Sequence, residues 1–206
     1  MTGFAGGAQG AQGFTVWLTG LRGSGKGSIA QAVAAELARR GMPTELLAGG
    51  EFRQNISRGL GFSREDRIAN VRRIGYVAKL LTRNGVAVVT TAISPNRAAR
   101  DECRRMIGRF VEVWVQCPLE VCEARDTEGL YRQARLGLIE DFTGIADDYE
   151  PPEDPELVVH SDRETAAQSA ARIVRRLEEL GYVPAERGGD PDEAMVKAQL
   201  KALQNR

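Results

Sequence analysis

Short apolar runs alternate with longer segments of helical spacing along most of the chain. The runs at Phe14–Thr19 and 86–91 are continuous, as expected for strands that are buried on both faces. Between 26 and 40 the apolar residues Ile29, Val33 and Leu37 recur instead at helical spacing, and Gly41 ends that helix. The alternation predicts an α/β fold in which helices cover both faces of a parallel sheet.

The same pattern continues toward the C-terminal end. Residues 63–66 read Ser-Arg-Glu-Asp, which resembles a capping box at the start of a helix that runs toward Arg83. A polar stretch at 127–155 interrupts the alternation. The further strands are predicted at 44–47, 110–116 and 157–159, and the further helices at 95–108, from Leu119, and at 163–180.

The two ends of the chain differ from the middle. Residues 1–13 are rich in Gly, Ala and Gln without periodicity, which predicts a flexible leader. Residues 185–206 predict a linker and a short amphipathic helix, with Val196, Leu200 and Leu203 on one face. We expect one domain at 14–184, with the C-terminal helix packed on it in preference to a partner.

Composition limits the possible functions. The chain has 206 residues, and its 28 basic and 28 acidic residues balance, so no overall field favours nucleic acid or an anionic membrane. No apolar run reaches the roughly 18 residues that cross a bilayer. Three cysteines without a C-x-x-C pair argue against disulfides and zinc. We expect a cytoplasmic protein with no resident metal.

A glycine-rich segment between the first strand and the first helix is the strongest local motif. It reads Gly-Leu-Arg-Gly-Ser-Gly-Lys-Gly from Gly20 to Gly27. In this context backbone N–H groups and a helix N-terminus surround phosphate oxygens, and Lys26 adds a charge for the β- and γ-phosphates. The predicted nucleotide contacts are Gly20, Gly23, Ser24, Gly25, Lys26, Gly27 and Ser28.

The eighth position of this motif departs from the usual pattern. A Ser or Thr hydroxyl normally binds Mg²⁺ there, but this chain has Gly27, and the hydroxyl follows at Ser28. One helical position is a rotation of about 100°, so Ser28 does not replace that ligand without rearrangement. We therefore expect ATP or ADP in the loop, with Mg²⁺ only if the protein is active.

Several motifs outside the loop share the pattern of one family. The motifs are Leu60-Gly61-Phe62-Ser63, Asp66-Arg67, Asn70-Val71-Arg72-Arg73-Ile74-Gly75, Ile93-Ser94-Pro95, Pro118-Leu119-Glu120-Val121-Cys122-Glu123, Gly129-Leu130-Tyr131, Ala134-Arg135 and Phe142-Thr143-Gly144-Ile145. With the loop, they resemble the adenylylsulfate kinases, which use ATP to phosphorylate the 3′-hydroxyl of adenylyl sulfate, and the match spans about 14–184.

The resemblance implies a pocket for adenylyl sulfate. Arginines of that pocket can bind sulfate and phosphate oxygens, and Phe62 and Phe142 can enclose an adenine ring. Arg125 is implied as a contact to the ATP nucleotide, and the lid that follows is implied to be mobile. The implied substrate contacts are Arg53, Phe62, Arg67, Asn70, Ile93, Ser94 and Phe142.

Other positions depart from the family. Its Asp-Gly-Asp-Asn motif is replaced by Ala48-Gly49-Gly50-Glu51, so both aspartates are absent. The family's paired lid lysines are replaced by Arg132 and Gln133, which removes one cation, whereas Arg135 remains. Lys26, Glu51 and Arg135 are the residues left as catalytic candidates.

Three functions follow as hypotheses. The first is a protein of sulfate assimilation that binds adenylyl sulfate or its 3′-phosphorylated product, with kinase activity weak or lost, as in the kinase-like regulatory domains of fungal ATP sulfurylases. The alternative is an active adenylylsulfate kinase. A second alternative is a non-catalytic interaction module. The family also implies a homodimer, and an ATP sulfurylase is a candidate partner.

Overall fold

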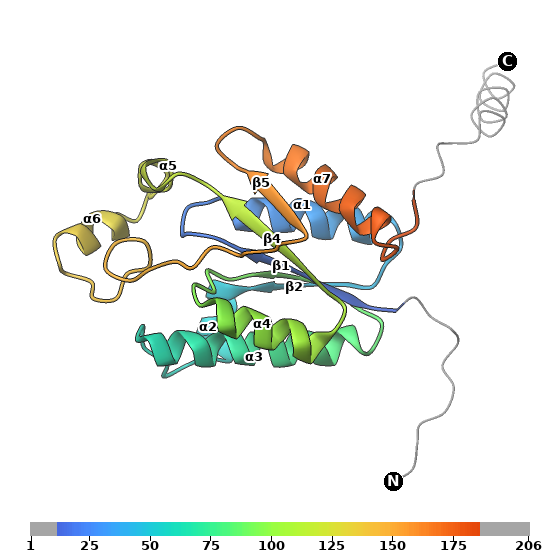
Figure 1. Ribbon diagram of the computed structural model, residues 1–206, viewed down its shortest axis with the longest axis horizontal. Helices are drawn as coiled ribbons and strands as arrows, with labels where there is room; N and C mark the ends of the chain where they lie inside the picture. Colours follow the sequence, from blue (N-terminus) through green and yellow to red (C-terminus); the bar gives the residue numbers. More distant parts are fainter. Residues whose placement is uncertain (1–11, 186–206) are drawn as a thin grey trace, which may run out of the picture.

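A parallel sheet of five strands runs through the middle of the molecule, of which the computed structural model describes residues 12–185 (Figure 1). The spatial order is β2-β3-β1-β4-β5, and every neighbouring pair is parallel. The strands are β1 (Phe14–Thr19), β2 (Thr44–Ala48), β3 (Ala87–Thr91), β4 (Phe110–Gln116) and β5 (Leu157–His160).

Helices cover the two faces of the sheet. In Figure 1, α1 (Lys26–Arg39) and α7 (Ala166–Glu179) lie on one face, and α3 (Arg64–Thr82) and α4 (Arg97–Ile107) lie on the other. Three short helices, α2 (Gly49–Asn55), α5 (Leu119–Ala124) and α6 (Leu130–Arg135), lie toward the end where the strands finish. This end of a parallel sheet is where α/β proteins bind ligands.

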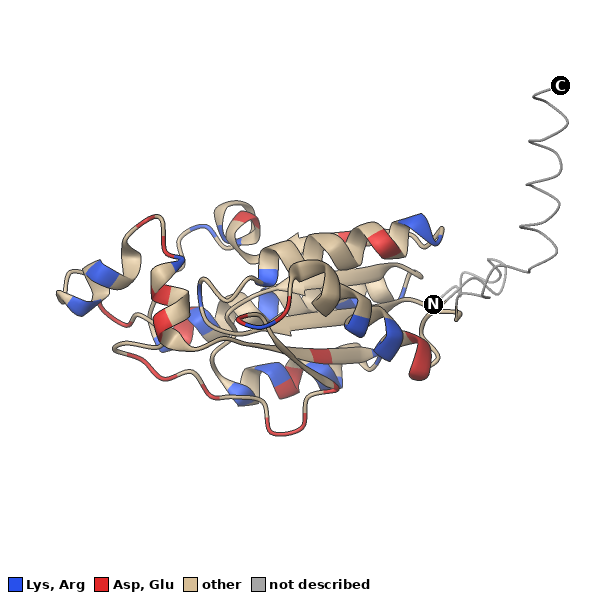
Figure 2. Ribbon diagram, turned by 90° about the horizontal axis from the view of Figure 1, so that it is seen from above, with Lys and Arg blue, Asp and Glu red and all other residues tan. Residues whose placement is uncertain are grey.

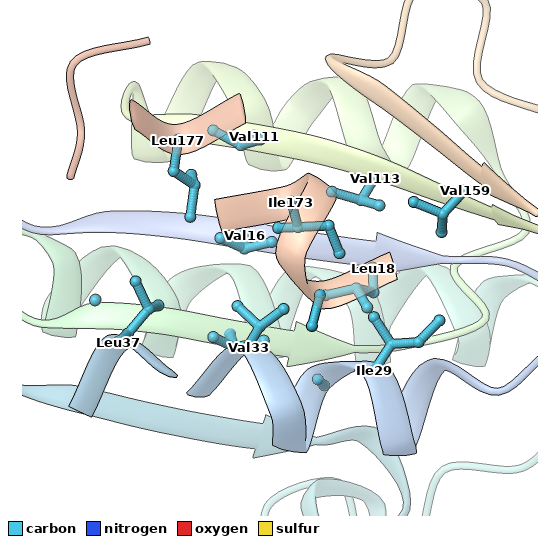
Figure 3. Close-up of a cluster of buried hydrophobic side chains, with 14 of the residues drawn as sticks. Val16, Leu18, Ile29, Val33, Leu37, Val111, Val113, Val159, Ile173 and Leu177 are labelled. Atoms are coloured by element: carbon cyan, nitrogen blue, oxygen red, sulfur yellow. The ribbon is translucent and has the colours of Figure 1, made fainter. Parts of the chain in front are cut away.

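Alternation along the central strand builds two hydrophobic cores. Val16 and Leu18 pack with Val33 and Ile173 between the sheet and the helices α1 and α7 (Figure 3). Trp17 points to the other face, where it stacks on Phe110 at 5.6 Å between ring centroids. All six residues of β1 are buried, so this strand is fixed from both sides and its carboxyl end is a rigid base for the phosphate loop.

The fold class predicted from the sequence is confirmed, with strand ends shifted by at most one residue. Two helices, α2 and α6, were missed because their 7 and 6 residues are too short for helical periodicity. Helix α7 begins later than predicted, since Thr165 and Gln168 form a capping box there. The predicted leader at 1–13 lies largely outside the described residues, and the C-terminal helix lies entirely outside them.

In Figure 2, Lys and Arg (blue) and Asp and Glu (red) are interspersed along the helices and loops of the described part of the chain. Among residues 12–185, no helix has the length and apolar content needed to cross a membrane.

Candidate active site

A cavity of about 810 Å³ opens at the carboxyl ends of the strands. Five segments form its walls: the phosphate loop, the start of α2, the start of α3, the loop after β3, and the lid. We define the lid as residues 129–150, of which 130 and 139–143 line the cavity. The lining residues are Arg22, Gly23, Gly25–Ser28, Gly49, Gly50, Arg53, Gln54, Phe62, Arg67, Asn70, Val71, Thr91–Pro95, Leu130 and Ile139–Thr143. One cavity therefore unites most of the predicted nucleotide loop with all of the predicted substrate contacts.

Backbone geometry explains the glycines of the loop. Gly20, Gly23 and Gly25 have positive φ values of 148°, 75° and 84°. A Cβ at Gly20 would lie 2.5 Å from the carbonyl oxygen of Val115, and one at Gly23 would lie 2.7 Å from that of Cys122. Only glycine fits these positions, so the loop before α1 is as tight as a phosphate site requires.

Lys26 is buried under this loop. Its Nζ donates hydrogen bonds to the carbonyl oxygens of Gly20 at 2.8 Å and Leu21 at 2.7 Å, and to Ser24 Oγ at 3.2 Å. Burial lowers the pKa of Lys26 to about 8, because the ammonium loses contact with water. All three of these hydrogen-bond partners are neutral oxygens. A bound phosphate would place a negative charge beside the ammonium, so Lys26 is suited to bind an anion.

Two glycines of the cavity have no structural reason to be glycine. Nothing lies within 4 Å of a Cβ added at Gly27 or Gly50, and neither has a positive φ. Every other glycine in the range 12–185 is either crowded or has a positive φ. Gly27 and Gly50 stand where side chains near magnesium were expected. The backbone at both positions could carry a larger residue, so backbone geometry does not explain why these side chains are absent.

The protein side chains do not fit a magnesium ion at the usual place. Among the described residues, no group of three or more His, Cys, Asp or Glu side chains could hold a metal. The carboxylates that line the cavity are Glu140 and Asp141 of the lid. A divalent cation would depend on phosphate oxygens and water for its ligands, as Mg²⁺ often does.

Arg67 stands at the substrate side of the cavity and is held by the lid. Its guanidinium donates to Asp147 Oδ2 at 2.7 Å, to the carbonyl oxygen of Phe62 at 2.8 Å, and to Thr143 Oγ1. Lid and α3 are therefore joined at the residue predicted to bind the sulfonucleotide. A ligand anion at Arg67 would have to share the guanidinium with Asp147 or replace it.

Arg53 and Phe62 form a second contact pair. The guanidinium of Arg53 lies 4.5 Å from the centroid of the Phe62 ring, and its Nη1 donates to the carbonyl oxygens of Leu60 and Gly61 at 3.1 and 2.7 Å. Phe62 is 61% exposed. An exposed ring with a cation on one face leaves the other face free to stack on a flat ligand.

The remaining substrate candidates also line the cavity. Phe142 packs edge-on against Tyr131 at 4.9 Å between ring centroids, and this contact holds the Phe142 ring in place at the cavity wall. The Oδ1 atom of Asn70 is buried without a hydrogen-bond partner within the described part of the chain. Ile93 and Ser94 come from the loop after β3, and Ser94 is only 2% exposed.

Five predicted residues do not line this cavity. Gly20 and Ser24 belong to the phosphate loop, where both accept hydrogen bonds from Lys26 Nζ. Glu51 lies on an exposed position of α2. Arg135 is paired with Glu123 of α5 at 2.5 Å. Arg125 donates to Cys117 Sγ at 3.6 Å and to the carbonyl oxygen of Ser161 at 2.9 Å. Their roles in catalysis or nucleotide binding remain predictions.

Other residues of the cavity were missed from the sequence. Arg22 lines it and pairs with Glu128 at 2.8 Å, and the lid adds Glu140, Asp141 and Thr143. Arg22 stands inside the loop motif, where the spacing alone could have marked it. The lid residues belong to a polar stretch without a motif. They reach the site because the folded chain brings this stretch next to the phosphate loop.

Fold and cavity together define a P-loop kinase fold, with a nucleotide loop and an adjoining substrate pocket at the ends of a five-stranded parallel sheet. The family model described as "Adenylylsulphate kinase" matches residues 12–160. The chain belongs to the adenylyl-sulfate kinase family.

Relatives agree over most of the chain. An adenylyl-sulfate kinase of Rippkaea orientalis is 55% identical over 172 residues, which cover 84% of this chain and 95% of that protein. A probable bifunctional SAT/APS kinase 2 of Sorangium cellulosum is 54% identical over 84% of this chain but over only 30% of its own length. The Mycobacterium tuberculosis APS kinase CysC, solved in complex with AMPPNP and APS, superposes with a TM-score of 0.78 at 40% identity, covering 81% of this chain and 98% of that one.

Proposed function

We propose that this protein transfers the γ-phosphoryl group of ATP to the 3′-hydroxyl of adenylyl sulfate, giving ADP and 3′-phosphoadenylyl sulfate. The observation that carries this proposal is the single cavity, because it holds Lys26 and Arg67 in its walls. Phosphoryl transfer depends on positioning two substrates side by side. The relatives named as adenylyl-sulfate kinases support the same reaction.

Each part of the cavity has a role in this proposal. Loop N–H groups and Lys26 hold the β- and γ-phosphates, and Arg67 and Arg53 bind the anionic groups of adenylyl sulfate. Phe62 and Phe142 enclose its adenine ring. In the transfer, the 3′-oxygen forms a bond to the γ-phosphorus, the bond from that phosphorus to the oxygen retained by ADP breaks, and the hydroxyl proton is released to water.

A second candidate is binding of adenylyl sulfate or its 3′-phosphorylated product with weak or lost turnover. The specific observation in its favour is the pair Gly27 and Gly50, which leave the reacting end of the cavity without the expected hydroxyl and carboxylate. Loss of one preorganised stabilising group can cost about 10²–10³ in rate. Ligand affinity depends less on these groups than turnover does.

A coupled ADP-release assay with ATP, magnesium and adenylyl sulfate separates the two candidates. Wild-type turnover near that of an active family member supports the kinase. Binding of both ligands by calorimetry with little turnover supports the second candidate. Failure to bind ATP, ADP, adenylyl sulfate and its 3′-phosphate would contradict both and favour an interaction module.

The double variant Gly27→Ser with Gly50→Asp sharpens this assay. Both side chains have room, so the variant should fold, and the second candidate predicts a rise in turnover of about 10–100-fold. The matched control is Gly27→Ala with Gly50→Asn, which adds similar volume without the hydroxyl or the charge. Equal turnover in both folded variants would show that the missing hydroxyl and carboxylate are not the cause of low turnover.

Two expectations about assembly also remain proposals. The hexameric APS kinase of Thiobacillus denitrificans and the bifunctional relative support self-association and a link to a sulfurylase. Light scattering of the purified chain, alone and with an ATP sulfurylase, checks them. The need for an ATP supply supports the expected cytoplasmic location.

A further inference from the structure

The loop after β3 has an unusual backbone where it forms a wall of the cavity. Ser94 has φ 42°, which places a residue other than glycine in the left-handed region. Its side chain is nearly fully buried, while its neighbours Ile93 and Pro95 also line the cavity. Such a conformation persists only where the surroundings hold it in place, and it occurs most often at functional sites.

Hydrogen bonds hold this turn from beneath the cavity. Trp17 Nε1 donates to Ser94 Oγ at 3.1 Å, and Ser94 Oγ donates to Thr19 Oγ1 at 3.0 Å. Thr19 Oγ1 in turn donates to the carbonyl oxygen of Ile93 at 2.7 Å. Thr19 is the last residue of β1, is fully buried and does not line the cavity, so it acts on the wall only through these bonds.

The lid is attached to the same hydroxyl. Tyr149 Oη lies 3.0 Å from Thr19 Oγ1. A hydroxyl has one proton to donate and two lone pairs to accept with, and Thr19 already donates to Ile93. Tyr149 must therefore be the donor. Burial raises the pKa of Tyr149 to about 12, so the phenol keeps its proton at neutral pH.

Further bonds tie the root of the lid to the turn. The N–H of Glu150 donates to the carbonyl oxygen of Pro95 at 2.9 Å. Arg100 bridges the two segments, since its Nη1 donates to the carbonyl oxygen of Ser94 at 2.6 Å and its Nη2 to that of Glu150 at 2.8 Å. These three bonds connect the turn directly to the end of the lid.

We propose that Thr19 and Tyr149 are positioning residues that hold the Ile93–Pro95 turn in the shape that binds adenylyl sulfate. This inference rests on the proposed binding of that ligand. Thr19 directly precedes Gly20, but within residues 12–185 neither side chain forms a hydrogen bond to the phosphate loop. The turn therefore governs the affinity for adenylyl sulfate and leaves the affinity for ADP nearly unchanged.

The test compares Thr19→Val with Thr15→Val. Thr15 lies on the same strand and the same face, is fully buried, and shares a hydrogen bond of 2.8 Å with Thr82 Oγ1 at the end of β1 away from the cavity. Both variants lose a buried hydroxyl and should lower the melting temperature. Calorimetry with adenylyl sulfate and, separately, with ADP provides the readout.

We expect Thr19→Val to weaken adenylyl sulfate binding by about tenfold, because it leaves buried polar groups unpaired, and to change ADP binding less than twofold. Thr15→Val should leave both affinities within twofold of wild type. Thr19→Ser should restore adenylyl sulfate binding, since the hydroxyl returns. Tyr149→Phe removes one hydrogen bond. It should weaken adenylyl sulfate binding by less than tenfold, again with little change in ADP binding.

Several outcomes would overturn the inference. These are equal effects of Thr19→Val and Thr15→Val on adenylyl sulfate, equal losses for adenylyl sulfate and ADP, and no rescue by serine. If Thr19→Val does not fold, Tyr149→Phe provides the same comparison. A wild-type chain that does not bind adenylyl sulfate would overturn the proposed function as well, whereas normal wild-type binding with unaffected variants would overturn this inference alone.

Discussion

The two sides of the cavity are built in different ways. The phosphate side consists of backbone from one continuous segment, and its buried cation, Lys26, is bound to oxygens of that same segment. The substrate side consists of side chains from α2, α3 and the lid, and its main cation, Arg67, is bound to residues 76 and 80 positions away. One side is local in the sequence and the other is assembled by the fold.

This difference indicates how each side can be altered. A loop whose shape is fixed by glycines keeps its geometry when neighbouring side chains change, so nucleotide binding can outlast the loss of groups such as those at Gly27 and Gly50. A pocket of arginines and aromatic rings depends on partners from several elements. The two sides should therefore respond separately to mutation and to pH.

Removing the buried cation of the loop should have the largest effect. Lys26→Met keeps the length of the side chain but deletes its charge, and we expect ATP or ADP affinity and any turnover to fall by about 100-fold or more. Adenylyl sulfate binding should change less than threefold. Calorimetry with each ligand measures both.

Lys79→Met is the matched control for this variant, because Lys79 lies in the last turn of α3, outside the cavity. It should leave both affinities unchanged. An equal loss of both ligands in Lys26→Met would contradict the separation of the two sides.

Removing the cation of the substrate side should give the opposite selectivity. Arg67→Gln deletes charged hydrogen bonds to the ligand, which predicts a loss of adenylyl sulfate affinity of about 10–100-fold with little change for ADP. Arg72→Gln is the control, since Arg72 is exposed and pairs with Glu102 at 2.9 Å. Similar affinities of the two variants for adenylyl sulfate would show that Arg67 holds the lid and does not bind this ligand.

A pH titration should give the smallest effect, and it should again change ligand affinity on the phosphate side more than on the substrate side. Burial lowers the pKa of Lys26 to about 8, so the ammonium is present below that pH and is lost above it. Phosphate binding favours the charged form, so ADP affinity should be highest below pH 8 and fall by up to about tenfold by pH 9. Calorimetry from pH 6.5 to 9 measures this decline, which should be absent in Lys26→Met.

Much of the cavity could be predicted from the sequence because its motifs are short and continuous. The loop from Gly20 to Gly27 carries its own geometry, and the family motifs around Phe62, Arg67 and Phe142 name residues that do line the cavity. Other predicted residues lie near the cavity without lining it. Glu51 and Arg135 are near the right segments, yet one points to an exposed surface and the other pairs with Glu123.

The sequence by itself therefore determined the fold class, the phosphate loop and the family, since each depends on local spacing and on turns that only glycine allows. The tertiary structure alone decided how the lid meets α3 through Asp147 and Arg67, and how Thr19 supports the turn at Ser94. Contacts between residues far apart in the chain leave no periodic trace in the sequence. They arise only when the sheet brings the ends of its strands together.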